Sequence, residues 1–380
     1  MTAPTRLALV IVLHSCAACS EEDGGKVEPQ GPFEWRTTAP PSVGLSAAAL
    51  EAMRSDLEQH GTQHLLVVRS DQIALEWYAA GRTEKTLHYT ASLAKALTCG
   101  VGLAVALGDG RLSLDDLVSK HVPRWQLKYT KTKAQVRVRH LASHSSGLED
   151  ALPKDEPGWK TKFWSRLQPP DDPFTLSRED APMMAAPGAA HRYSNPGFAM
   201  LSYAITASLS GATHHDLRTL LSERVMKPIG VADADWRVGY GQTFTVDGLP
   251  LVPCWGGGDY TARAIARVGR LLLHRGRWQD EQLIPSSAVD ATTTAAPGET
   301  VAPDGPACAP GWWVNSNGRL ALPVDAVIGL GAEHQLLVVI PSLDLILVRM
   351  GGALTSDAMA WAAVDEHVAA PLMAAVVGSP

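Results

Sequence analysis

Two residues three positions apart, Ser92 and Lys95, could form a nucleophile and its base. If a helix begins near Ser92, Lys95 lies one turn further on the same face, so its amine can reach the serine oxygen. A lysine desolvated in a cleft can lose its proton near neutral pH and then accept the proton of a serine hydroxyl. The amides at the start of a helix would also favour an oxyanion. Taken alone, the motif fits a helix-capping serine and a solvated lysine equally well.

A second motif, Tyr193-Ser194-Asn195, rarely arises by chance, because the chain holds only seven tyrosines. Pro196 suits the first turn of a helix that we expect from Gly197 to about residue 209. In the extended segment before it, Tyr193 and Asn195 would project the same way. Beside a cationic lysine, the tyrosine pKa could be lowered so that the phenol shuttles a proton, while the asparagine binds a substrate carbonyl and holds the lysine. The alternative is a core tyrosine and a helix-capping asparagine.

The elements that must position these motifs come from both ends of the chain. Ser46 is expected to cap a helix that ends near residue 59. Apolar runs bounded by turns predict a hairpin at 64–69 and 72–77 and three strands at 325–331, 335–341 and 343–350, with a final helix at 356–376. The Pro-rich middle, about 110–250, is predicted to be helical. We therefore expect an α/β (α+β) fold, with one antiparallel sheet built from both chain ends, flanked by helices, and an inserted helical lobe whose boundary with the sheet forms a cleft.

The N-terminus has the pattern of an export signal. Arg6 precedes an apolar run at 7–13, which is far shorter than a membrane-spanning helix. Cys16 and Cys19 each end a sequence similar to the site at which bacterial lipoproteins are cleaved and lipidated; the alternative is an ordinary signal peptide. We expect a signal at 1–19, a flexible tether at 20–35 and a folded domain at 36–376, in a protein that is periplasmic or in the cell envelope, with a lipid anchor through Cys16 or Cys19.

Composition excludes several other classes of function. With 46% hydrophobic residues the chain can bury a large core, and a net charge of −6 without a Lys/Arg run argues against nucleic acid as a partner. No spacing of Cys or His predicts a metal site, and no glycine-rich nucleotide loop is present, so no cofactor is expected. The Gly-x-Ser-x-Gly turn of α/β-hydrolases is also missing. Cys254 and Cys308 are a candidate disulfide in an oxidising periplasm.

With these motifs, the sequence from about 40 to 375 resembles the penicillin-recognising serine hydrolases, which have the β-lactamase/DD-peptidase fold. This family includes class C β-lactamases, DD-peptidases, family VIII-type carboxylesterases and 6-aminohexanoate-dimer hydrolases. Besides Ser92-x-x-Lys95 and Tyr193-x-Asn195, the resemblance rests on GRLSLDD (110–116), VRHLASHSSGL (138–148), GGG (256–258), ARAIAR (262–267) and GRW (276–278). The resemblance implies catalysis by Ser92, Lys95 and Tyr193, with Asn195 in substrate binding. The HSSG stretch at 144–147 is expected to be a buried structural turn.

The third motif of the family departs from its usual form. Where relatives carry Lys-Thr-Gly or His-x-Gly on a strand, this chain has VIGLG at 327–331, without a cation or a hydroxyl. That form resembles the 6-aminohexanoate-dimer hydrolase and esterase branch, and it lacks the group that holds the carboxylate of β-lactam substrates. Gly329 would let a backbone approach the acyl carbonyl. By resemblance, the amides of Ser92 and Leu330 would form the oxyanion hole, to within about one residue.

The sequence therefore predicts a serine hydrolase that acts on a small-molecule ester or amide through a covalent acyl-enzyme. β-Lactamase or DD-peptidase activity is an alternative. A non-catalytic lipoprotein that binds penicillin or peptidoglycan is an alternative of a different class. Trp255, Trp312 and Trp313 either line an acyl pocket or belong to the core.

Overall fold

The computed structural model describes Met1 and residues 33–295, 305–357 and 359–378. The predicted signal after Met1, both candidate lipidation cysteines and most of the tether therefore lie outside the described residues. From residue 33 onward, the described chain forms one compact unit. Its centre is an eight-stranded sheet in the order β1-β3-β2-β15-β14-β13-β12-β11. The strands are β1 (Arg36–Thr37), β2 (Thr62–Arg69), β3 (Gln72–Tyr78), β11 (Ala307–Ala309), β12 (Trp312–Val314), β13 (Val327–Gly331), β14 (Gln335–Ile340) and β15 (Leu345–Gly351).

The two ends of the chain meet at the centre of this sheet. β2 pairs antiparallel with β15, with Val68 opposite Ile346, and the predicted hairpin is β2 and β3. This pairing confirms the expected sheet built from both chain ends. The short β1 departs from the rest, because it pairs parallel with β3.

Alternating side chains of the central strands enter two different cores. Val68 and Ile346 belong to one hydrophobic cluster, whereas Val67 and Leu345 belong to the other. Both faces of the sheet are therefore buried, which is why these strands read as continuous apolar runs.

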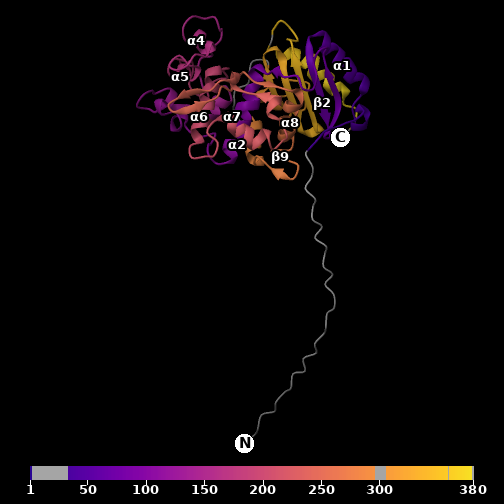
Figure 1. The fold of residues 1–380 in the computed structure, drawn as a ribbon, viewed down its shortest axis with the longest axis horizontal. Coiled ribbons are helices and arrows are strands. Elements are labelled where there is room, and N and C mark those ends of the chain that lie inside the picture. The colour runs from indigo at the N-terminus through magenta and orange to yellow at the C-terminus, as the bar shows by residue number, and fades with distance from the viewer. Residues whose placement is uncertain (2–32, 296–304, 358, 379–380) are drawn as a thin grey trace. The chain divides into compact units, whose positions relative to one another are not determined.

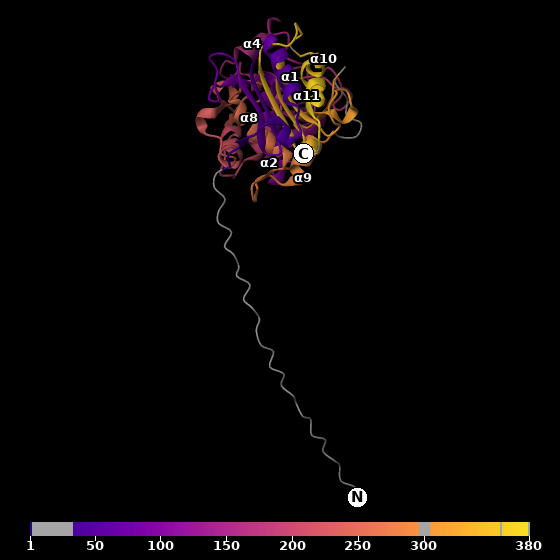
Figure 2. The ribbon, with the colours of Figure 1, turned by 90° about the vertical axis from the view of Figure 1, so that its right-hand side faces the viewer.

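Helices cover both faces, as Figure 2 shows. On one side lies α8 (Ala262–Leu273), and Gly269 allows it to approach closely, because a Cβ there would come within 3.0 Å of Leu337 and Ile346 side-chain atoms. On the other side lie α1 (Ala47–Gln59), α10 (Trp361–Val364) and α11 (Ala370–Ala375), the last two joined by a π-helical turn, η13 (Asp365–Ala369). Ser46 accepts a hydrogen bond from the Ala49 amide, so the predicted cap of α1 is confirmed.

The helical lobe lies beside the sheet, on the left in Figure 1. Its helices are α2 (Val101–Gly108), α3 (Val138–Ala142), α4 (Trp159–Ser165), α5 (Pro173–Glu179), α6 (Asn195–Ser208) and α7 (Leu217–Leu221). Short strands and turns occupy much of the rest of the lobe, including β6 (Phe244–Val246) and β7 (Leu249–Leu251). Within the described residues, one helical run, Ala91–Gly108, is long and apolar enough to cross a membrane. Because 78% of it is buried inside the protein, it serves as a core helix.

The disulfide differs from the one considered from the sequence. Cys254 is bonded to Cys99, 155 residues away, with Cα atoms 5.5 Å apart. Cys308 lies buried on β11, at the far end of the sheet order. Sequence spacing could not choose between the two partners, because only the packing of the lobe brings Cys99 beside Cys254.

Candidate active site

Ser92 lies in a tight turn that opens the core helix. The short strand β4 (His88–Tyr89) leads into a single 3-10 turn, Ala91–Leu93, and Ala91 has a left-handed φ of 46°. The chain continues through a π-helical segment, η3 (Lys95–Gly100), into α2. Ser92 and Lys95 therefore follow one helical course, as predicted, although the first turns are not regular α-helix. Leu93 and Ala94 are buried, which anchors the turn, while Ser92 keeps partial access to solvent.

The Lys95 side chain is buried and is held by three hydrogen-bond acceptors. Its Nζ lies 3.2 Å from Ser92 Oγ, 2.7 Å from Asn195 Oδ1 and 2.7 Å from the Trp255 carbonyl oxygen. Burial lowers the pKa of Lys95 to about 7, because the charged amine has lost most of its water, and Asp150 opposes that shift only in part. A fraction of the amine is therefore neutral at physiological pH and able to take a proton.

Tyr193 approaches the same serine from the other side. Its hydroxyl donates to Ser92 Oγ at 2.8 Å, and Lys95 Nζ lies 4.7 Å from the centre of its ring. The expected lowering of the Tyr193 pKa is wrong. Burial raises the pKa of the phenol and outweighs the hydrogen bond to Ser92. Tyr193 therefore stays protonated at neutral pH and offers a proton rather than a phenolate.

Asn195 is the first residue of α6, and a carboxylate that the sequence analysis missed holds it. Asp150 Oδ1 accepts from both the Asn195 amide nitrogen and its side-chain Nδ2, at 2.8 and 2.9 Å. This fixes the amide so that its Oδ1 faces Lys95. The cap of α6 is Ser194, which accepts from the Gly197 amide, so Asn195 is not the capping residue. The only sequence signal for Asp150 is its place two residues after the 138–148 landmark.

The stretch 144–147 forms a buried turn, and that turn supports the tyrosine. The His144 ring stacks on Tyr193 with centroids 4.3 Å apart, and its Nδ1 accepts from the Ser194 amide at 3.2 Å. Burial keeps the pKa of His144 well below its usual value, so the ring is neutral. His144 therefore positions Tyr193 and adds no charge to the site.

The strand beside the nucleophile is shifted in register from the sequence expectation. Gly329 and Leu330 line a cavity of about 20 Å³ behind Ser92, which has room for little more than one water. Gly331 crosses directly against the nucleophile turn: a Cβ there would lie 2.1 Å from the Thr90 carbonyl oxygen and 3.2 Å from the Ser92 amide nitrogen. The next residue, Ala332, lines the open pocket with Ser92. Ala332 rather than Leu330 therefore borders the open pocket, which makes its amide the candidate for the second oxyanion donor.

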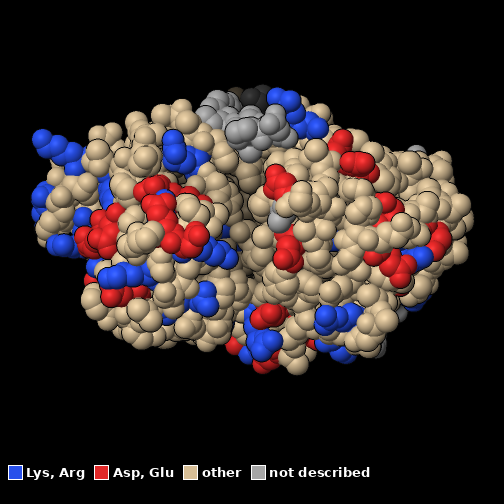
Figure 3. Space-filling view, turned by 90° about the horizontal axis from the view of Figure 1, so that it is seen from above, with Lys and Arg blue, Asp and Glu red and all other residues tan. Residues whose placement is uncertain are grey.

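An open pocket of about 440 Å³ leads to Ser92 Oγ. Its walls are mainly aromatic and apolar, and among the described residues that line it, Lys154 is the one Lys or Arg. The lining residues are Ala91, Ser92, Leu152, Lys154, Trp164, Tyr193, Asn195, Tyr240, Trp255, Gly256, Trp313, Ala332, Met359 and Trp361. Trp255 and Trp313 therefore line this open pocket, whereas Trp312 lines the small cavity behind the serine. On the face seen in Figure 3, a furrow separates the lobe from the sheet side, and charges of both signs are interspersed.

One group of potential metal ligands occurs elsewhere in the described chain. Asp56 and His60 at the end of α1 and His367 in η13 bring their ligand atoms within 4.8 Å of one another. No sequence motif predicts this group, because its members come from opposite ends of the chain. His367 Nδ1 already pairs with Asp56 Oδ2 at 2.8 Å, and His60 Nδ1 lies 2.8 Å from the Asp56 carbonyl oxygen. These contacts account for the cluster as a link between α1 and the C-terminal helices.

Comparison with known proteins adds the family context of this geometry. The sequence model of the family described as Beta-lactamase matches residues 51–367. The 6-aminohexanoate-dimer hydrolase of Paenarthrobacter ureafaciens is 25% identical over 346 residues, which cover 86% of this chain and 82% of that protein. Among solved structures, a putative 6-aminohexanoate-dimer hydrolase from Bacillus anthracis superposes with a TM-score of 0.65 at 20% identity, covering 90% of this chain and 87% of that one. A family VIII carboxylesterase superposes with a TM-score of 0.64 at 15% identity, covering 90% and 99%.

Proposed function

The chain belongs to the β-lactamase family, and on that premise we propose that it is a serine hydrolase that cleaves an ester or amide through a covalent acyl-enzyme. One observation carries the proposal: Ser92 Oγ is contacted both by the buried Lys95 amine, at 3.2 Å, and by the Tyr193 hydroxyl, at 2.8 Å. A serine that served only as a helix cap would not require a desolvated base beside it, since burying an amine costs free energy.

The proton moves along these contacts. Neutral Lys95 accepts the Ser92 proton as Oγ attacks the substrate carbonyl, and the carbonyl oxygen becomes an oxyanion held by the Ser92 and Ala332 amides. Tyr193 donates a proton to the leaving alcohol or amine, and the ammonium of Lys95 restores the proton that the phenol gave up. Water then attacks the acyl-enzyme with Lys95 again as base. As the acyl bond breaks, the Lys95 ammonium returns that proton to Ser92 Oγ, which releases the acid and restores the serine and the neutral amine.

The pocket walls favour a bulky apolar substrate. Aromatic side chains such as Trp164, Trp313 and Trp361 offer large contact areas to an apolar acyl or alcohol group. β13 contains no Lys or Arg. The Lys154 side chain lies over the Trp164 ring, with its Nζ 4.7 Å from the ring centre. We therefore propose uncharged esters or linear amides as the main substrates, with β-lactams, which carry a carboxylate, as poor ones.

Covalent trapping tests the proposal directly. The protein is mixed with p-nitrophenyl butyrate, with a short linear amide or with nitrocefin, quenched in acid, and its peptides are mapped by mass spectrometry. We expect a transient butyryl adduct on the Ser92 peptide together with release of p-nitrophenol over many turnovers. A permanent adduct would instead indicate an acyl-trapping binder, and the absence of any adduct on Ser92 would refute the hydrolase.

The rate should depend on pH through Lys95. Because the base must be neutral, kcat/KM should rise as pH increases through about 7, the pKa to which burial lowers Lys95. The phenol of Tyr193 remains protonated over this range, since burial raises its pKa. Initial rates with an uncharged ester between pH 5 and 9 give the profile. A kcat/KM that still rises about tenfold per pH unit up to pH 9, without levelling off, would contradict the assignment.

We also propose that the protein is exported and held at the cell envelope, with Cys16 or Cys19 lipidated. Two features support this: the apolar run behind Arg6, and the Cys99–Cys254 disulfide, a bond that forms and persists in oxidising compartments. Fractionation of cells, with lipid labelling of the wild type and of Cys16→Ala and Cys19→Ala variants, tests both parts.

A further inference from the structure

Three separate segments hold the Lys95 amine in place. Its own helix, η3, supplies the side chain; the start of α6 supplies Asn195 Oδ1; and the segment after β7 supplies the Trp255 carbonyl oxygen. A shift of any one segment would break a hydrogen bond of the amine or admit water beside it. The site therefore needs a device that fixes these segments relative to one another.

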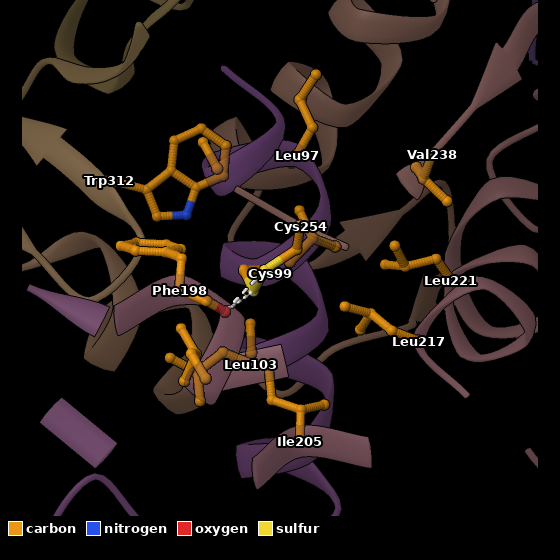
Figure 4. Close-up of a cluster of buried hydrophobic side chains, with 14 of the residues drawn as sticks. Leu97, Cys99, Leu103, Phe198, Ile205, Leu217, Leu221, Val238, Cys254 and Trp312 are labelled. Atoms are coloured by element: carbon orange, nitrogen blue, oxygen red, sulfur yellow. Dashed lines mark hydrogen bonds between the residues drawn. A yellow bond between two sulfur atoms is a disulfide. The ribbon is translucent and has the colours of Figure 1, made fainter. Parts of the chain in front are cut away.

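The Cys99–Cys254 disulfide lies where the three segments meet. Cys99 follows Lys95 by four residues, about one turn, on η3, and Cys254 directly precedes Trp255. Both sulfur atoms also lie against α6, at 3.8 and 3.3 Å from the Phe198 carbonyl oxygen. Figure 4 shows the bond within a cluster of buried apolar side chains that includes Phe198 and Leu103. Both cysteines are fully buried.

We propose that this disulfide positions the catalytic base: it ties the Lys95 helix to the Trp255 carbonyl and so keeps the amine oriented and shielded from water. The proposal rests on the hydrolase function proposed above. Cys99 and Cys254 do not touch the reacting atoms, so they act through Lys95 and are positioning residues. Oxidation of these two thiols then becomes a condition for full activity, which ties catalysis to an oxidising compartment.

Other contacts limit the size of the effect. The Trp255 ring packs against Phe163 and Phe174, with centroids 4.9 and 5.5 Å apart, so the segment stays folded without the bond. The charged and titratable groups that face Lys95 are Asp150, Tyr193 and His144, and none of them belongs to the disulfide segments. We therefore expect an amine that is more solvated, and more often protonated near neutral pH, in an otherwise intact site.

The test compares the wild type with the double variant Cys99→Ala/Cys254→Ala. Peptide mapping without reductant first establishes that the Cys99 and Cys254 peptides are joined in the wild type. In the double variant we expect kcat to fall about tenfold, KM to stay within about twofold, and the acid limb of kcat/KM to move to higher pH, because a solvated amine holds its proton more tightly. If the first double variant fails to fold, Cys99→Val/Cys254→Ala is the second variant, because the valine fills part of the space that the sulfur atoms leave.

The matched control is Leu103→Ala, one turn beyond Cys99 on the same helical run. Leu103 is fully buried, so this change also leaves a cavity and lowers stability, but it leaves both supports of Lys95 in place. At a temperature where all the variants are folded, Leu103→Ala should keep the wild-type kcat and pH profile. The proposal is overturned if the double variant has the same kcat and the same pH profile as Leu103→Ala. It is also overturned if the Cys99 and Cys254 peptides of the wild type are not joined.

Titration of Lys95 itself separates this inference from the proposed function. The apparent pKa of the Lys95 amine, measured by NMR on protein labelled with ¹³C at the lysine Cε and with Lys95→Met to assign the signal, does not depend on turnover. We expect it to be higher in the double variant than in the wild type. If the wild type shows no turnover that depends on Ser92, the hydrolase function is refuted. If the Lys95 pKa is the same in the double variant as in the wild type, only the positioning role of the disulfide is refuted.

Discussion

Replacing Ser92 with Ala should lower kcat/KM for an ester substrate by at least about 10³-fold, the largest loss expected from any single change in this protein. The variant lacks the oxygen that forms the acyl bond, while Lys95 keeps its contacts with Asn195 and Trp255. Fold and pocket should therefore persist, and only the covalent step should disappear. Initial rates with p-nitrophenyl butyrate, corrected for hydrolysis without enzyme, measure the loss.

Ser202→Ala is the matched control for that loss. Ser202 is also buried on a helix of the lobe, and its hydroxyl donates to the Val252 carbonyl oxygen at 2.6 Å. It lies outside the pocket lining, so its removal should change stability slightly and the rate within about twofold. Equal activity of Ser92→Ala and Ser202→Ala would show that hydrolysis proceeds without Ser92.

Replacing Lys95 with Met should lower kcat by about 10²- to 10⁴-fold, because the serine loses its base. The same change should alter how stability depends on pH. An unfolded lysine titrates near its ordinary value, and burial lowers the folded pKa to about 7. Below pH 7 both states hold the proton, so the folded protein bears the full cost of the buried charge. Above pH 7 the unfolded state binds more protons, and wild-type stability rises with pH.

Urea unfolding of the wild type and Lys95→Met at pH 6, 8 and 9 measures that second effect. Relative to Lys95→Met, the unfolding free energy of the wild type should increase by up to about 1.4 kcal/mol for each pH unit above pH 7. The control is Lys133→Met, since burial also lowers the Lys133 pKa, to about 8, but its amine binds the Arg178 carbonyl far along the chain from Ser92. It should show a similar pH-dependent difference and keep the catalytic rate. If the difference in unfolding free energy between the wild type and Lys95→Met is the same at pH 6 and pH 9, Lys95 is not a buried amine with a lowered pKa.

The fold was predictable where the pattern was local or repeated. Apolar runs bounded by turn residues located β2, β3, β13, β14 and β15, and Ser46 marked the start of α1, because strand burial and helix capping act on neighbouring residues. The two chemical motifs were predictable for the same reason. Three residues of helix bring Lys95 to Ser92, and an extended segment turns Tyr193 and Asn195 the same way.

What the sequence left open depends on contacts between distant segments. Asp150 reaches Asn195 and Cys99 reaches Cys254 only after the lobe itself has packed. Gly331 meets the backbone of the nucleophile turn only where β13 lies beside that turn. The direction of the Tyr193 pKa shift was decided in the same way, because desolvation depends on every atom around the phenol and the nearby lysine is one contribution among them. The sequence by itself determined which chemical groups are available and their local spacing. The tertiary structure decided how far these groups are removed from water and which side chains they contact, since burial and long-range pairing are properties of the packed chain.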